Sequence, residues 1–145
     1  MIAVDTNILA YAHRPESEFH ERAARFVRTL AEGDQAWAVP WPCVHEFLAL
    51  VTHPRVFKHP TPLSDALAQV SSWISSPTAQ LLGETPGYFP ILHSVLQSGL
   101  VIGPRIHDAR LVAICLANRV TTLCSADRDF SRFSTSLSIV NPLAR

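Results

Sequence analysis

The stretch MIAVDTNIL at residues 1–9 decides the fold that we expect for this chain. Its apolar run at residues 2–4 is typical of a short buried strand, and Asp5 follows at the point where that strand ends. Other short runs of apolar or β-branched residues lie further along the chain, with prolines between many of the segments. We expect these further strands at residues 37–39, 79–82, 120–124 and 138–140.

Between these strands, apolar residues recur at the spacing of amphipathic helices. Pro42, Pro62 and Pro86 stand where three of the helices begin, and Gly33 and Gly99 follow two helix ends. The predicted helices span residues 19–30, 42–51, 61–74, 85–96 and 106–118. Alternating strands and helices predict an α/β fold, a three-layer α/β/α sandwich with a central parallel sheet. The length of 145 residues suits a single domain from residue 1 to residue 145.

The composition favours a folded protein of the cytoplasm. Hydrophobic residues make up 48% of the chain and charged residues 17%, which argues against disorder. No apolar run approaches the roughly 20 residues that cross a bilayer, and the amino terminus lacks the pattern of a secretory signal. Cys43, Cys115 and Cys124 show no CxxC spacing, so we expect reduced, mostly buried thiols. We therefore expect a cytoplasmic protein with no membrane contact.

The formal net charge is zero at pH 7, which by itself offers no attraction for nucleic acid. Lys58 is the only lysine, so arginine supplies the other basic side chains. Arginine presents a planar fork of donors that suits phosphate groups. If several acids are held together in one site, the remaining surface is basic in spite of the neutral sum. A GC-rich genome explains the arginine content equally well.

Acidic residues follow the predicted strands repeatedly, and they fall at the same end of the predicted sheet. Ligands of open parallel sheets bind at this end, outside the carboxyl ends of the strands. Any one of these acids alone is more often a helix cap or a surface charge, but several at one end favour a shared site. The acids are Asp5, Glu46, Asp108, Asp127 and Asp129.

The chemistry of such a cluster points to a metal ion. Carboxylates crowded together raise each other's pKa unless a cation neutralises them. Hard oxygen ligands without cysteine partners suit Mg²⁺ or Mn²⁺ rather than zinc. These ions polarise phosphate groups and generate a nucleophilic hydroxide from water, which favours a phosphodiester-cleaving enzyme.

The order and spacing of these motifs resemble the PIN-domain family, and most of all the VapC-type toxins of bacterial toxin–antitoxin pairs. The resemblance rests on residues 1–9, Glu46, Asp108-Ala109 and the segment SADRDF at residues 125–130. The segments VTHPRVF at residues 51–57 and NPL at residues 141–143 are also similar to one VapC subgroup. The resemblance implies an endoribonuclease that uses Mg²⁺ or Mn²⁺ and cleaves RNA such as tRNA or rRNA. It also implies a homodimer that is inhibited by a cognate antitoxin protein.

Carried over by position, the resemblance assigns roles to eight residues. It implies that Asp5, Glu46, Asp108 and Asp127 are the catalytic, metal-binding acids, and that Asp129 is an alternative or auxiliary ligand. Three hydrogen-bonding side chains would orient the carboxylates or water. They are Thr6, Asn7 and Ser125, the last of which stands where the family more often has threonine.

Two other functions are weighed against the nuclease. Phosphatases with an aspartate nucleophile also place an acid after the first strand. They need a second acid two positions later, where this chain has Asn7. They also need a lysine, and Lys58 is the only lysine of this chain. A catalytically inactive binding module with the same fold is disfavoured because all the expected acids are present.

Several other residues remain candidates for roles around the site. Adjacent residues on a helix point roughly 100° apart, so His45 and His107 are expected to face away from the metal of their acidic neighbours. His13, Arg14 and Arg110 are the candidates to meet phosphate. The tryptophans are expected in the core, with base stacking as the alternative. Apolar surface on the helices at residues 16–31 and 63–75 would suit an antitoxin groove or a dimer interface.

Overall fold

Five short strands form one sheet in the order β3-β2-β1-β4-β5, and every neighbouring pair is parallel. The computed structural model describes all residues from 1 to 145. The strands lie where the sequence predicts them, at β1 (Ile2–Val4), β2 (Trp37–Pro40), β3 (Ala79–Leu82), β4 (Thr122–Cys124) and β5 (Ser138–Val140). Because the chain builds β2 and β3 on one side of β1 and β4 and β5 on the other, the strand order reverses between β1 and β4. A crevice for a ligand is expected at such a reversal.

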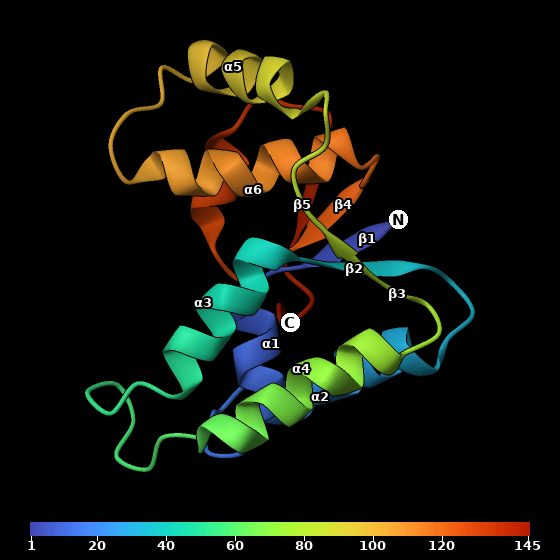
Figure 1. Cartoon of the computed structure of the whole chain (residues 1–145), viewed down its shortest axis with the longest axis vertical. Coiled ribbons are helices and arrows are strands. Elements are labelled where there is room, and N and C mark those ends of the chain that lie inside the picture. The colour runs from blue at the N-terminus through green and yellow to red at the C-terminus, as the bar shows by residue number, and fades with distance from the viewer.

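Helices cover both faces of this sheet and confirm the predicted three-layer α/β/α sandwich. They are α1 (Thr6–His13), α2 (His20–Glu32), α3 (Trp41–Val51), α4 (Leu63–Ser75), α5 (Tyr88–Ser98) and α6 (Arg105–Ala117), with a short 3₁₀ helix η1 (Arg128–Arg132). Figure 1 shows α5 and α6 together on one side of the strands and α1, α2 and α4 on the other side. No helix is both long enough and apolar enough to span a bilayer.

Helix α1 and the short η1 are not among the predicted helices. The reason is clearest for α1. Its side chains at Thr6, Ile8, Leu9 and Ala10 are all buried. An amphipathic helix is recognised by a polar face that alternates with an apolar one, and a helix buried on most sides lacks this pattern. Asp5 marks the start of the helix, since its carboxylate accepts a hydrogen bond from the backbone N–H of Thr6.

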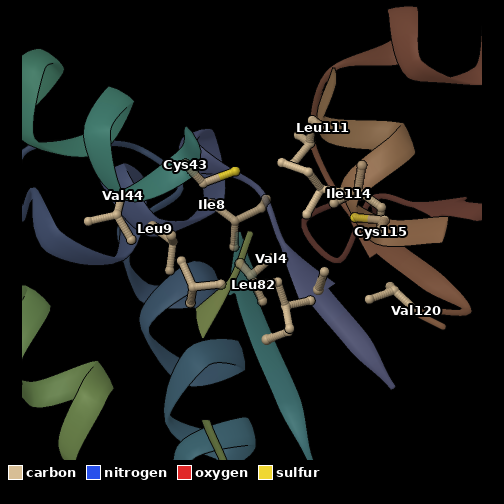
Figure 2. Packing of buried hydrophobic residues seen from close by; sticks show 14 of the residues in the cluster. Val4, Ile8, Leu9, Cys43, Val44, Leu82, Leu111, Ile114, Cys115 and Val120 are labelled. Atoms are coloured by element: carbon tan, nitrogen blue, oxygen red, sulfur yellow. The ribbon is translucent and has the colours of Figure 1, made fainter. Parts of the chain in front are cut away.

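The core lies between the sheet and both helical layers. Figure 2 shows side chains from β1, α1, α3 and α6, among them Val4, Ile8, Cys43 and Ile114, which belong to one buried cluster. All three cysteines are buried and unpaired, as the sequence predicts. This packing fixes α1, α3 and α6 relative to the sheet. Glu46 lies on α3 and Asp108 on α6, and Asp5 directly precedes α1.

Candidate functional site

Asp5 is the buried centre of the site, only 5% exposed at the carboxyl end of β1. Four donors hold its carboxylate. The Thr6 backbone N–H lies 2.7 Å and the Cys43 thiol 3.6 Å from Oδ1. The Ser125 hydroxyl donates to Oδ2 at 2.7 Å and the Asn7 amide donates to it at 3.2 Å. The orientation of Asp5 is therefore fixed before any ligand binds.

Burial is the largest influence on the ionisation of Asp5 and raises the pKa of its carboxyl group above the ordinary value. The hydrogen bonds from Ser125 and Thr6 oppose this effect, and the negative charge of Glu46 adds to it. A carboxyl group with this many donors is built to carry a negative charge, yet its surroundings disfavour that charge. A cation in contact with the carboxylate would resolve the conflict.

Asn7 and Ser125 connect the end of β1 to the loop that follows β4. The Asn7 amide donates to the Ser125 hydroxyl oxygen at 3.2 Å, and the Ala126 backbone N–H donates to Asn7 Oδ1 at 3.1 Å. The Asp127 backbone N–H donates to Ser125 Oγ at 3.0 Å. These bonds place Asp127 beside the end of β1, although more than a hundred residues separate the two segments.

Glu46 and Asp108 approach the same place from α3 and α6. The Thr6 hydroxyl donates to Glu46 Oε2 at 3.0 Å, so one residue contacts both the Asp5 and the Glu46 carboxylates. Asp108 is half-buried, and burial is the first cause of its raised pKa. The negative charges of Asp127, Glu46 and Asp129 raise the pKa of Asp108 further, in that order, so these acids lie within electrostatic range of one another.

Asp127 and Asp129 occupy different places although only one residue separates them. Asp127 lines the central pocket, and its Oδ1 also accepts the backbone N–H of Asp129 at 2.8 Å at the start of η1. Asp129 is absent from the pocket wall and lies 3.5 Å from the Arg132 guanidinium. This geometry favours Asp127 over Asp129 as the acid that meets a ligand.

The acids surround one pocket of about 600 Å³ between α1, α3, α6 and the segment after β4. Two histidines and an arginine complete its polar wall. Because the pocket is wide, His45 and His107 contribute to its wall although each was expected to turn away from the neighbouring acid. The polar and charged lining residues are Asp5, Thr6, Asn7, His45, Glu46, His107, Asp108, Arg110 and Asp127.

The prediction that His13 and Arg14 meet phosphate at this site is wrong. Helix α1 carries them away from Asp5 toward the loop before α4. His13 lies 3.1 Å from the Thr61 hydroxyl, and Arg14 donates to the same oxygen at 3.0 Å. The Arg14 guanidinium also lies over the Phe57 ring, 4.1 Å from its centroid. Both side chains therefore hold the α3–α4 connection in place. Arg110 does reach the pocket, but its Nε is bonded to Glu84 at 2.6 Å.

The donor set fits a hard divalent cation better than a thiophilic one. Four carboxylates line the pocket. Burial raises the pKa of the Cys43 thiol well above its usual range, so this sulfur stays protonated. No three acidic, histidine or cysteine side chains are close enough together to form a finished ligand shell. The carboxylates share one pocket, and their charges repel one another without forming a complete ligand set.

Comparison with known proteins gives a consistent result. Residues 2–135 match the model of the PIN domain. The VapC ribonuclease Mb2897 of Mycobacterium bovis is 34% identical over 133 residues, which are 92% of this chain and 90% of that protein. Ribonuclease VapC48 of Mycobacterium tuberculosis is 30% identical over 129 residues, 89% of each chain.

Solved structures share the fold at lower sequence identity. One is VapBC2 of Rickettsia felis bound to a DNA fragment from its promoter, with a TM-score of 0.69 and 19% identity over 97% of this chain and 98% of that one. Another is VapC20 of Mycobacterium tuberculosis, described as a toxin that cleaves the sarcin–ricin loop. Its TM-score is 0.63 and its identity 16%, over 90% of this chain and 93% of that one.

Proposed function

Because this chain belongs to the PIN-domain family, we propose that it is an endoribonuclease that hydrolyses phosphodiester bonds of RNA with the help of Mg²⁺ or Mn²⁺. The ribonuclease relatives that are 34% and 30% identical to this chain over the aligned residues support this activity. One structural observation carries the proposal. Four carboxylates from separate parts of the chain line a single pocket, namely Asp5, Glu46, Asp108 and Asp127.

These four acids are the residues that would hold the cation. When bound, it would polarise a phosphate group and lower the pKa of a water molecule that attacks it. The protein itself supplies orientation. The Ser125 and Asn7 side chains hold one oxygen of Asp5, and Thr6 fixes both Asp5 and Glu46. Such supporting hydrogen bonds keep ligands in place before the metal and the substrate arrive.

An aspartate-nucleophile phosphatase is disfavoured by the way in which Asn7 is used. The Asn7 amide donates to Asp5 Oδ2 and to Ser125 Oγ, and its oxygen accepts the Ala126 N–H. The residue is a bridge between two strand ends, and an acid there would lose both donated bonds. This observation leaves the nuclease as the function that the geometry supports.

The test is cleavage of labelled RNA by the purified protein with Mn²⁺ and with EDTA. We expect cleavage only with the metal, and loss of cleavage in Asp108→Asn, which removes one anionic ligand at nearly constant volume. Asp129→Asn is the matched control, because Asp129 lies outside the pocket wall. Near-normal activity of Asp108→Asn, or equal losses in the two variants, would contradict the assignment.

We also propose that the protein is the toxin of a toxin–antitoxin pair and that its inhibitor inserts a basic side chain among the carboxylates. An arginine can take the place of the metal charge and make paired hydrogen bonds to carboxylate. The exposed apolar residues Leu63, Leu67 and Ile74 of α4 would contact the rest of this partner. Co-purification from the native host should yield a small partner whose binding is weakened by Mn²⁺; a partner indifferent to Mn²⁺ would refute the insertion.

A homodimer is the expected assembly of the toxin. Large apolar side chains are exposed at Phe89, near the start of α5, and at Leu100 and Ile102 in the α5–α6 connection. We expect them to contribute to the contact with a second copy. Light scattering of the purified protein tests this expectation, since a monomer at micromolar concentration would contradict it.

A further inference from the structure

The tryptophans of this chain lie in two different environments. Trp37 and Trp73 belong to the core and are 0% and 5% exposed, as expected for large aromatic side chains. Trp41 is 39% exposed at the first residue of α3. The residue that follows it, Pro42, already lines the carboxylate pocket. An exposed indole at this place is not explained by packing of the core.

Trp41 is not itself part of the pocket wall, but it lies next to two residues that are, Pro42 and His45. Its ring centroid lies 6.1 Å from that of His45, with 33° between the ring planes, and His45 is part of the pocket wall. Gly83 has no side chain, and a Cβ atom added to it would lie 3.7 Å from Trp41 Cδ1. The indole therefore lies close to the Gly83 backbone. The Asn118 amide donates to the Gly83 carbonyl at 3.0 Å and keeps that segment in place. The indole is therefore supported while part of its surface remains open to solvent.

The charges around the pocket favour uncharged contacts to the bases of a bound RNA. Four carboxylates line the pocket and repel phosphate groups, and the net charge of the chain is zero. The one arginine in the pocket wall, Arg110, is bonded to Glu84, which partly neutralises it. Near the pocket, contacts to the bases would therefore add to the affinity that phosphate pairing elsewhere on the surface provides. Stacking of a base on an aromatic ring is such a contact and is tolerant of sequence.

We propose that Trp41, with His45 beside it, forms a stacking site for one unpaired base of the RNA substrate, next to the bond that is cut. This inference rests on the proposed ribonuclease function. It restricts the substrate class to RNA in which that nucleotide is unstacked, as in a single strand or a loop. In a duplex, each base is already stacked on the neighbouring bases and is not available to Trp41.

The first experiment measures tryptophan fluorescence when a short single-stranded RNA is added to the cleavage-deficient variant Asp108→Asn. Only Trp41 is exposed, so RNA should quench the fluorescence of this residue and shield it from a soluble quencher. The quenching should persist when Trp73→Phe is added to Asp108→Asn, and it should vanish when Trp41→Phe is added instead. Quenching that persists without Trp41, or RNA binding without any quenching, overturns the stacking site.

The second experiment measures kcat/KM of the otherwise unchanged enzyme on RNAs that carry one abasic nucleotide at successive positions. Trp41→Ala should lower kcat/KM on intact RNA by about 5- to 150-fold, the range for loss of one base–aromatic stack. An abasic nucleotide at one position should cause the same loss in the parent and no additional loss in Trp41→Ala. Trp41→Phe should retain most of the parental value, and its melting temperature, like that of Trp41→Ala, reports whether the fold is intact.

The outcomes separate the stacking site from the ribonuclease function. If the parent cleaves RNA but the losses from Trp41→Ala and from the abasic nucleotide add at every position, the stacking site is wrong and the ribonuclease proposal stands. If Trp41→Ala weakens only the binding of a protein inhibitor, the surface belongs to that partner and the inference is likewise wrong. If the parent cleaves no RNA with Mn²⁺, the ribonuclease proposal fails, and the quenching experiment still decides whether RNA stacks on Trp41.

Discussion

Asp5 and Asp108 both have raised pKa values, but the protein holds the two side chains in different ways. Asp5 is buried and bonded to the Ser125 hydroxyl and the Thr6 backbone. The main influences on the pKa of Asp108 are burial and neighbouring charges rather than hydrogen bonds. Replacing Asp5 by asparagine would turn one acceptor oxygen into a donor facing other donors. Asp108 is therefore the cleaner position at which to measure repulsion within the cluster.

We expect Asp108→Asn to melt at a higher temperature than the parent in EDTA. The substitution removes a charge that repels Asp127 and Glu46 in the folded protein, whereas the unfolded chain separates these acids. For a domain of this size each kcal/mol shifts the melting temperature by roughly 2–4 °C, so differential scanning fluorimetry can measure the effect. Asp129→Asn should change melting less. A lower melting temperature for Asp108→Asn would make this acid a structural cap instead.

The difference between parent and Asp108→Asn should depend on pH in a defined direction. Since folding raises the pKa of Asp108 above its ordinary value of 3.8, the folded state binds this proton more tightly than the unfolded state. The folded parent then gains stability as pH falls through the raised pKa toward 3.8. Melting curves in EDTA should therefore converge for the two proteins as pH is lowered. A gap that widens toward acid pH would mean that the charged form of Asp108 is stabilised by folding.

Ser125 provides a test of the support given to Asp5. Its hydroxyl donates to Asp5 Oδ2 and accepts the Asp127 N–H, so it links two of the proposed ligands. Ser125→Ala should lower metal affinity or activity by about 10- to 100-fold, as is typical when a group that orients a metal ligand is lost. Ser125→Thr keeps the hydroxyl and should stay close to the parent. Mn²⁺ titrations of cleavage compare the three proteins, and equal activity of the alanine variant would refute the role.

The location of a site residue could be predicted from the sequence where its place relative to a strand or helix determines it. Asp5 and Asp127 follow strands, Asp108 lies in the first turn of α6 and Glu46 in the second turn of α3. A parallel sheet brings such positions to one edge. The Cys43 thiol contact with Asp5 could not be predicted, because it depends on the rotation of α3 about its axis.

At the level of elements, α3 connects the core to the pocket. Its Phe47 is fully buried and packs edge-on against Trp73 of α4 with 4.7 Å between ring centroids, while the preceding residue, Glu46, faces the pocket. Neighbouring residues on a helix point in different directions, so a single turn serves both purposes. Displacement of this turn would move a proposed ligand.

Phe47→Ala should destabilise the fold by about 3–5 kcal/mol, because it removes a buried ring and leaves a cavity. The matched control is Leu67→Ala on α4, where the side chain is exposed and a change within about 0.5 kcal/mol is expected. Urea unfolding of both variants measures the free energy of unfolding. Similar small effects at the two positions would show that Phe47 is not part of the stabilising core.

The elements themselves were predicted unevenly, for physical reasons. The helices α2 and α4 show apolar residues at helical spacing because one face of each is exposed. The helix α1 is buried around Ile8, Leu9 and Ala10, so its pattern gives no period. Because α1 was not predicted, the positions of His13 and Arg14 at its end were predicted wrongly.

At the scale of the whole molecule, topology explains where the site lies. The sheet reverses its order between β1 and β4, and Asp5 and Asp127 come from the segments that follow these two strands. Helices α3 and α6 then bring Glu46 and Asp108 to the same opening. The alternation of strands and helices predicts this arrangement in outline. The width of the pocket and the positions of His45 and His107 on its wall depend on helix packing, which the sequence pattern does not determine.

The most direct test is a calorimetric titration of Mn²⁺ into the parent, Asp108→Asn and Asp129→Asn. If the four acids form one cation site, the parent binds Mn²⁺ and is stabilised by about 2.7 kcal/mol at a hundredfold excess over the dissociation constant. Asp108→Asn should lose this binding and Asp129→Asn should keep it. Equal Mn²⁺ binding by all three proteins, or no binding by the parent, would contradict a metal site at these carboxylates.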